Sequence, residues 1–163
     1  MTRVLRPQPL TKAAFARFGD VIEPTGDGDT INYGAAAKFA DLARIDVARE
    51  GGRPSVHLYS ARPLPPPITI EIMERHPLGS QAFAPLDARD FIVVVAPAGD
   101  LDPDAISAFR AAGGQGVNFA PGVWHHFCLA LSPTRFLVID RTGPGENLDE
   151  VRLAPEQQWR LKT

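Results

Sequence analysis

The sequence predicts a mainly β fold, built as one sandwich or small barrel with a few short helices. Three observations support this prediction. The chain has 163 residues, which suits a single domain over residues 1–163. Its apolar runs are short, and most alternate with polar residues, as strands with one buried face do. Its 16 prolines and 14 glycines are spread between these runs, which is typical of tight turns between strands.

The first element expected is a short helix over Thr11–Phe18. Thr11 can cap its amino end, Phe15 and Phe18 share one face, and Gly19 can end it. The other elements expected are mostly strands, each bounded by turn residues: Ile45–Val47, Val56–Ser60, Ile68–His76, Gln81–Pro85, Phe91–Ala96, Gly116–Phe119, Val123–Ala130 and Arg135–Arg141.

A second helix is expected to start at Asp102-Pro103, because proline is favoured at the first position of a helix. Ile106 and Phe109 would share its apolar face, and Gly113-Gly114 would end it. With its apolar face towards the strands, such a helix would close one end of a barrel.

Composition and charge exclude several classes of function. The formal net charge of −2 offers no basic surface for nucleic acid or anionic lipid. No apolar run approaches the ~20 residues of a membrane-spanning helix, and the amino end has no apolar signal core. The single Cys128 excludes an intrachain disulfide framework and a multi-cysteine zinc site. We therefore expect a cytoplasmic protein that acts on a small molecule, not on nucleic acid or a membrane.

Side-chain alternation predicts polar groups on the inner faces of two strands. In the Ile68–His76 run the even positions share a face, and three isoleucines mark it as the inner one. Glu74 and His76 continue this face, provided that no bulge intervenes. In the Val123–Ala130 run His125 shares a face with apolar residues, and His126 points the opposite way. A buried carboxylate or imidazole is costly unless it is paired, hydrogen-bonded or bound to a metal.

The segments ERHPLGSQAF and GVNFAPGVWHH resemble degenerate versions of the two cupin motifs. In the second, a glycine, a proline-glycine turn and His125 stand at the family's positions. In the first, Glu74 stands in place of a histidine, His76 matches the second histidine, and Gln81 falls at the glutamate position. The resemblance implies a cupin-like antiparallel β-barrel in which these four residues form a metal site. The neutral amide of Gln81 makes this a weaker set than three histidines and a glutamate.

Longer segments resemble the ureidoglycolate lyase family. They are HPLGSQAF, VWHH, the strand end Ile139–Arg141, Ile31–Gly34 and the FGDVI that follows the first helix, in the family's order and spacing. The resemblance implies an enzyme of allantoin (purine) catabolism that splits ureidoglycolate into glyoxylate and urea. It also implies a homodimer and a divalent metal. We expect nickel, manganese or zinc to bind weakly, and no organic cofactor to be needed.

The lyase reaction can be matched to these residues. One carbon of ureidoglycolate carries a carboxylate, a hydroxyl and the ureido nitrogen. Its cleavage needs a base for the hydroxyl, an acid for the departing nitrogen, and a cation or hydrogen-bond donors for the carboxylate. His76, His125 and Glu74 are the candidate catalytic residues, as ligands or proton carriers. The candidate substrate-binding residues are Gln81, Asn118, Asp140, Arg141 and His126.

Other interpretations of the same residues stay open. The histidines could be core residues bonded to backbone carbonyls, and Asp140 and Arg141 could form a structural pair. His57 is expected on the surface, because its strand neighbours are apolar. Two further functions fit the composition: an amidohydrolase that releases ammonia and carbon dioxide from ureidoglycolate, and a non-catalytic cupin that binds a small carboxylate.

Overall fold

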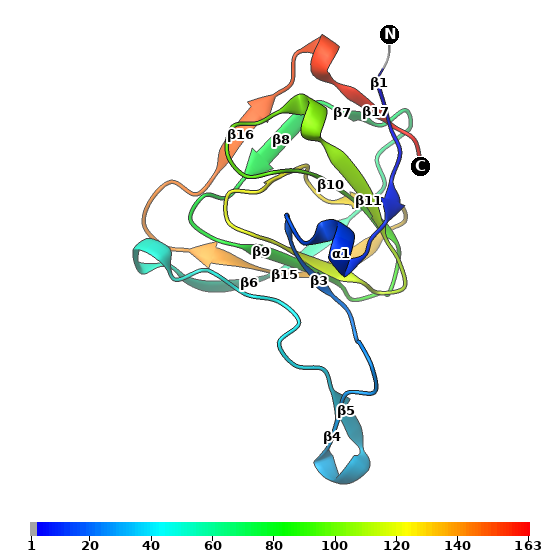
Figure 1. Ribbon diagram of the computed structural model, residues 1–163, viewed down its shortest axis with the longest axis vertical. Coiled ribbons are helices and arrows are strands. Elements are labelled where there is room, and N and C mark those ends of the chain that lie inside the picture. Colours follow the sequence, from blue (N-terminus) through cyan, green and yellow to red (C-terminus); the bar gives the residue numbers. More distant parts are fainter. Residues whose placement is uncertain (1–2) are drawn as a thin grey trace.

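The computed structural model describes residues 3–163, which are mainly β-strands with one α-helix in that range (Figure 1). Two sheets carry the fold. The site sheet has the strand order β16-β8-β13-β10-β11-β2, with β14 also paired to β10. The facing sheet has the order β3-β12-β9-β15-β6. The prediction of a mainly β, cupin-like fold is confirmed, although the strand pairs form separate sheets and no single closed ring.

The strands of each sheet come from distant parts of the chain. The site sheet contains β2 (Gln8–Pro9), β8 (Ile72–Arg75), β10 (Phe91–Ala96), β11 (Ser107–Ala111), β13 (Trp124–His125), β14 (Leu129–Ala130) and β16 (Asp149–Arg152). The facing sheet contains β3 (Gly19–Ile22), β6 (Arg53–Ala61), β9 (Gln81–Pro85), β12 (Gly116–Phe119) and β15 (Thr134–Thr142). A third sheet contains β1 (Arg3–Leu5), β17 (Trp159–Leu161) and β7 (Thr69–Ile70). The short helices are α1 (Lys12–Phe15) and the 3-10 turns η1 (Asn32–Gly34), η2 (Arg49–Gly51), η3 (Pro103–Ala105) and η4 (Pro155–Gln157).

The main core lies between the site sheet and the facing sheet. Alternate residues point into it, such as Val93 and Val95 from β10 and Phe136 from β15. The first helix adds Phe15, whose ring meets that of Phe109 edge to face with centroids 5.6 Å apart. Burial of each such side chain contributes about 1.5–3 kcal/mol, so this core is the main support for the two sheets.

The first helix is where the sequence predicted it, but it is shorter. It spans Lys12–Phe15, and the Thr11 hydroxyl accepts a hydrogen bond from the Ala14 amide at 3.2 Å. Gly19 follows with φ +143°, and a Cβ there would lie 1.9 Å from the Asn118 carbonyl oxygen. Only glycine therefore lets the chain leave the helix and pair directly with β12.

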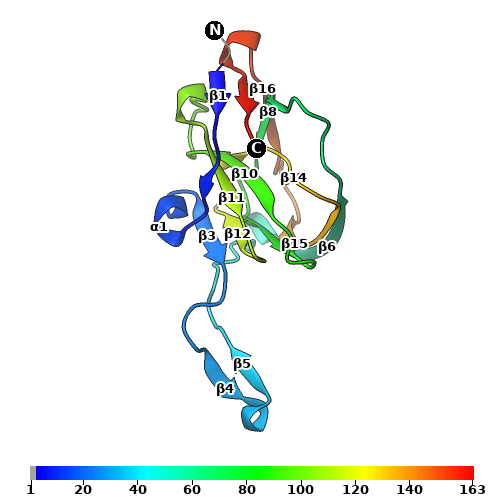
Figure 2. The same cartoon turned by 90° about the vertical axis from the view of Figure 1, so that its right-hand side faces the viewer.

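A second core lies on the outer side of the site sheet, under the third sheet. It includes Ile70, Met73, Val94 and Trp124. Figure 2 shows β1 and β17, from the two ends of the chain, side by side above this layer; they pair in parallel. The central strand β10 is thus covered on both faces, and all six of its residues are buried.

The helix expected from Asp102 onward is wrong. A single 3-10 turn, η3, is followed by β11, which pairs antiparallel with β10. Ala108 packs in the outer core and Phe109 in the main core. Because both faces of this strand are covered, its apolar residues do not alternate with polar ones, and the run imitates the apolar pattern of a helix.

Two strands expected to be continuous are interrupted. The Ile68–His76 run breaks at Glu71, between β7 and β8, and the Val123–Ala130 run breaks after His125. Each break reverses the alternation of side chains. Ile70 consequently packs in the outer core with Met73, so the isoleucines do not mark the inner face. Glu74 still points inward because Met73, its neighbour on β8, points outward.

The other strands expected from the sequence are confirmed, except that Ile45–Val47 forms no strand. The expectation that His57 lies on the surface is met only in part, because its side chain is 41% exposed. Its ring is half-buried and bonds to Asp140, while Val56 and Leu58 are 65% and 71% exposed. The apolar neighbours, not the histidine, face outward on β6.

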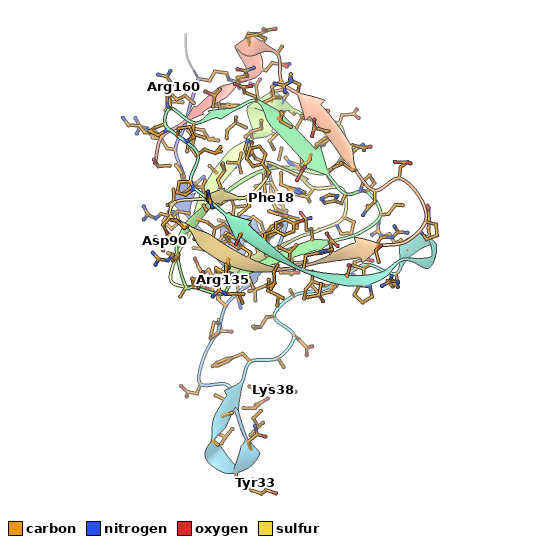
Figure 3. All side chains as sticks on the ribbon, turned by 180° about the vertical axis from the view of Figure 1, so that it is seen from behind. Phe18, Tyr33, Lys38, Asp90, Arg135 and Arg160 are labelled. Atoms are coloured by element: carbon orange, nitrogen blue, oxygen red, sulfur yellow. The ribbon has the colours of Figure 1, made fainter. Side chains whose placement is uncertain are left out.

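A hairpin projects from the body of the molecule (Figures 1 and 2). It consists of β4 (Asp29–Ile31), η1 and β5 (Ala36–Lys38), and is called the arm below. Tyr33, in η1, lies at its tip (Figure 3). Within residues 3–163, no helix is long and apolar enough to cross a membrane.

Candidate functional site

Glu74 and His125 lie directly opposite each other on the paired strands β8 and β13. Residues directly opposite each other on antiparallel strands point to the same face of the sheet, where their side chains come into contact. Here both point into the space between the two sheets, and Glu74 Oε1 lies 3.5 Å from His125 Nε2. The cluster therefore starts from a register between two strands, not from a flexible loop.

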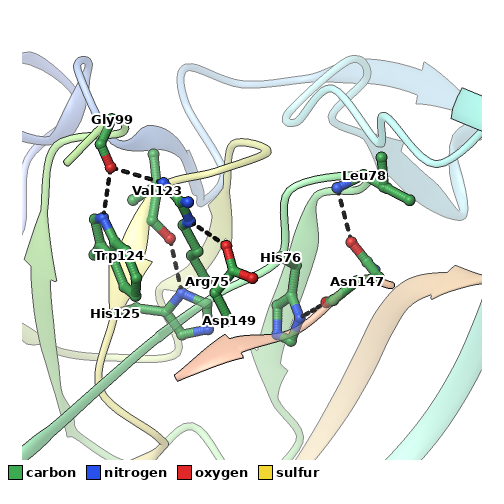
Figure 4. A network of polar contacts seen from close by, with 9 residues as sticks. All are labelled: Arg75, His76, Leu78, Gly99, Val123, Trp124, His125, Asn147 and Asp149. Atoms are coloured by element: carbon green, nitrogen blue, oxygen red, sulfur yellow. Dashed lines mark hydrogen bonds and ion pairs between the residues drawn. The ribbon is translucent and has the colours of Figure 1, made fainter. Parts of the chain in front are cut away.

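His76 joins this pair from the end of β8. Its Nδ1 lies 2.7 Å from the backbone carbonyl of Asn147, which only accepts hydrogen bonds, so Nδ1 carries the proton (Figure 4). The Asn147 side chain accepts a bond from the Leu78 amide at 2.8 Å, which fixes the loop against β8. The lone pair of His76 is thus left on Nε2.

His125 is held in the same way. Its Nδ1 donates to the Val123 carbonyl at 3.1 Å, and its ring stacks on Phe119 with centroids 4.3 Å apart and planes 9° from parallel. The Nε2 atoms of His76 and His125 are both buried and have no hydrogen-bond partner among residues 3–163. A bond from Nδ1–H to a carbonyl, with Nε2 left free, is the usual state of a metal-binding histidine.

The facing sheet supplies the opposite wall. Gln81 on β9 is buried, and its Oε1 has no hydrogen-bond partner. Asp140 on β15 bonds to His57 Nε2 at 3.0 Å. Gln81 and Asp140 line the same pocket as Glu74 and His76, with a volume of about 380 Å³. That volume suits a small metabolite.

The donor set fits a divalent cation. Ligand atoms of Glu74, His76 and His125 lie within 4.8 Å of one another. Two imidazole lone pairs and a carboxylate facing one point repel one another unless a cation or a proton lies between them. Nitrogen and carboxylate donors of this kind suit zinc, nickel or manganese. A cation there would satisfy buried atoms that otherwise lack partners.

The comparison with known proteins agrees with this geometry. A family model described as ureidoglycolate lyase matches residues 2–161. The chain belongs to the ureidoglycolate lyase family. A ureidoglycolate lyase of Burkholderia mallei (strain NCTC 10229) is 55% identical over 159 residues, which cover 96% of this chain and 93% of that protein. The ureidoglycolate lyase of Burkholderia cepacia is 51% identical over 99% of this chain and 92% of its own length, and that of Azotobacter vinelandii (strain DJ / ATCC BAA-1303) is 48% identical over 98% of both.

In this family member the pKa values of Glu74 and Cys128 are shifted in opposite directions. A proton between His125 Nε2 and the carboxylate favours the anion and holds the pKa of Glu74 below its usual value, and the nearby His76 and His126 act in the same direction against the effect of burial. Glu74 is therefore an anion at neutral pH. Burial raises the pKa of the Cys128 thiol to about 12, so Cys128 is no nucleophile at neutral pH.

Three of the predicted substrate-binding residues do not join the cluster. His126 lines a separate small cavity beside Phe83 and Cys128, and burial lowers its pKa. Asn118 points to the other face of its sheet, where its amide nitrogen donates to Asp20 and to the Arg44 carbonyl. These placements follow from the break after His125 and from the alternation of β12, whose Val117 and Phe119 point into the core.

Arg141 is the third predicted substrate-binding residue that lies outside the cluster. It lies on the outer face of β15, one position after Asp140, and is buried. Its guanidinium donates to the carbonyls of Arg49, Glu50 and Pro144, at 2.7 Å for the last. The expected pair with Asp140 does not form, because adjacent strand residues point to opposite faces. Arg141 fastens two loops outside the pocket.

Three residues of this region were not singled out from the sequence. His57 and Tyr59 on β6 face the pocket side, and Tyr59 lines it. Asn147 orients His76 through its backbone carbonyl. The only sequence signal for His57 was its alternation with Val56 and Leu58. Because those two residues are exposed, the alternation places His57 on the inner face of β6 and not on the outer one. A backbone contact such as that of Asn147 leaves no signal in residue types.

Proposed function

We propose that the protein is a ureidoglycolate lyase that splits ureidoglycolate into glyoxylate and urea. The observation that carries the proposal is the convergence of Glu74, His76 and His125 at the wall of a pocket of metabolite size, which Glu74 and His76 line directly. Membership of the family and the names of relatives that match nearly the whole chain support it. The reaction breaks one C–N bond and consumes no water, so no seryl or cysteinyl nucleophile is required.

The cluster would hold a divalent ion, with Glu74, His76 and His125 as ligands and Gln81 as a weaker fourth. Such an ion would polarise the carboxylate and hydroxyl of the substrate and favour loss of the hydroxyl proton. The histidines are oriented for this by the carbonyls of Asn147 and Val123. The neutral Gln81 makes the site weak enough to lose its ion during purification.

The opposite wall would serve the leaving group. The departing ureido nitrogen needs a proton as the C–N bond breaks. On the facing sheet His57 Nε2–H donates to the Asp140 carboxylate across 3.0 Å, while the ligand cluster lies on the site sheet. A substrate held by its carboxylate at the cluster would direct its ureido group toward this pair. Asp140 is accordingly the residue of the facing sheet that we assign to substrate binding.

The experiment that tests the function is product analysis with ureidoglycolate. Urea and glyoxylate in equal amounts support the lyase. Ammonia and carbon dioxide support the amidohydrolase, and no turnover by metal-loaded protein supports a non-catalytic cupin.

A place in allantoin catabolism, a cytoplasmic location and a homodimer belong to the same proposal. The dimer is supported by β6, which lies at the edge of its sheet and exposes Val56 and Leu58. Exposed edge strands are usually paired or covered.

A further inference from the structure

The arm has no partner of its own within residues 3–163. β4 and β5 form a two-stranded sheet that pairs with no other strand of that range. The two views at right angles show it standing clear of the body, and Figure 3 places Tyr33 at the far end. An isolated two-stranded hairpin is marginal in water and gains stability by packing on something else.

The composition of the arm is that of a docking element. Its tip exposes Ile31 and the whole side chain of Tyr33, and alanines follow at 35 to 37. Asn32 and Tyr33 both have positive φ, 53° and 56°. Tyrosine rarely adopts this conformation, and such residues persist where surrounding contacts hold them. The arm itself supplies few such contacts.

The pocket of the proposed lyase has an apolar rim that is exposed to solvent. Its rim exposes two large apolar side chains, Phe127 at 45% and Leu148 at 53%, and Tyr59 lies beside them. Exposed apolar side chains that gather at one place often mark a contact surface. The Glu74 side chain is 25% exposed in this pocket, so water reaches its carboxylate unless something covers the rim.

We infer that two copies of the chain exchange their arms, and that the tip of each arm packs across the rim formed by Phe127 and Leu148 of the other copy. A two-fold axis provides both contacts at once, because each copy offers one arm and one rim. The arm points away from its own body and cannot supply the cover itself. Each pocket is then complete only in the dimer. This inference rests on the proposed function only for its activity readout.

The first test replaces residues 29–38 with a short Gly-Ser linker and, separately, changes Tyr33→Asp. Tyr33 is fully exposed, so the point variant should fold normally. Light scattering should show weaker dimers, with the dissociation constant raised about tenfold or more by loss of a central aromatic contact. Urea release should fall with it. Leu86→Asp, at an exposed apolar residue away from the pocket lining, is the matched control and should change neither.

The second test is complementation between two defective chains. The linker variant is mixed with His125→Ala, which keeps its arm but lacks a ligand. In a mixed dimer the arm of the His125→Ala chain covers the intact cluster of the other chain. Random pairing should restore about a quarter of the wild-type activity.

Two outcomes would overturn the inference: no recovery on mixing, or linker and Tyr33→Asp variants that remain dimeric and fully active. If wild-type protein forms no urea at all, the proposed function fails, while the dimer measurement still decides the role of the arm.

Discussion

At the scale of single residues, two short contacts define the chemistry of the cluster. The carbonyls of Asn147 and Val123 take the Nδ1 protons of His76 and His125, and this leaves both Nε2 atoms as acceptors beside the Glu74 carboxylate. In the other tautomer Nε2 would carry the proton, and neither ring could bind a cation through that atom. The backbone therefore decides what the side chains can do.

Removal of one histidine should abolish metal binding. His125→Ala should show no nickel, manganese or zinc binding by calorimetry and lose roughly 10²–10⁴-fold in rate. Gln81→Ala should weaken binding only slightly, because water can replace a neutral amide ligand. His126→Gln, next in sequence but outside the cluster, is the control and should bind the ion normally. If stripped wild-type protein binds none of the three ions and is fully active, the metal plays no part, and Glu74 and the histidines act as base and acid.

Cys128 should resist alkylation in the folded protein. Burial raises the pKa of its thiol from 9.0 to about 12, so the reactive thiolate at pH 8 is about a thousandfold rarer than in the unfolded chain. Intact-mass analysis after iodoacetamide treatment at pH 8 should find unmodified native protein and singly modified protein in urea. Equal rates in the two states would show that the thiol is not buried as described.

At the scale of elements, Gly19 joins the first helix to the facing sheet. Its φ of +143° and the 1.9 Å approach of a Cβ to the Asn118 carbonyl leave no space for a side chain. Gly26 also has positive φ, +67°, but a Cβ there meets nothing within 4 Å. Alanine variants at the two positions therefore separate the effect of a steric clash on the free energy of unfolding from the effect of backbone strain.

Gly19→Ala should destabilise the protein more than Gly26→Ala does. Strain alone should cost about 1–2 kcal/mol at Gly26. The clash should add at least ~2 kcal/mol at Gly19, because the obstacle is backbone that is part of a strand pair. Urea unfolding followed by circular dichroism measures both. Equal losses in the two variants would contradict the close packing of β3 on β12.

Sequence patterns predicted strands well where one face is exposed or the run is short. Gln81–Pro85, Phe91–Ala96 and Gly116–Phe119 are predicted with their observed bounds. The patterns failed at Ala108 and Phe109, because both faces of this strand are covered, so alternation carries no information, and the preceding Asp102-Pro103 favoured a helix. They also failed across the break at Glu71, because a bulge depends on tertiary packing.

The ligand cluster was predicted in spite of that break, because motif resemblance fixed Glu74, His76 and His125 independently of strand phase. The opposite wall was only partly predicted. Asp140 was a candidate because the strand end Ile139–Arg141 resembles the family, whereas His57 was missed because its apolar neighbours face outward. Which side of an edge strand is covered depends on the arrangement of the sheets and on other chains.

At the scale of the whole molecule, the two sheets have different tasks. The site sheet carries the ligand cluster between two cores, which makes it the rigid part. The facing sheet supplies Gln81 and Asp140 and ends in the exposed edge strand β6. In the proposed dimer, the arm extends from these sheets toward a second copy. Chemistry is thus placed on the best-packed strands, and assembly on the least covered ones.

The central claim is that this pocket cleaves a C–N bond without water. The most direct measurement incubates metal-loaded protein with ureidoglycolate and quantifies urea, glyoxylate and ammonia over time, with His125→Ala as the blank. We predict urea and glyoxylate in a one-to-one ratio, no ammonia, and a rate for His125→Ala lowered roughly 10²–10⁴-fold. Ammonia formed in step with glyoxylate, or equal rates in the two proteins, would contradict the account.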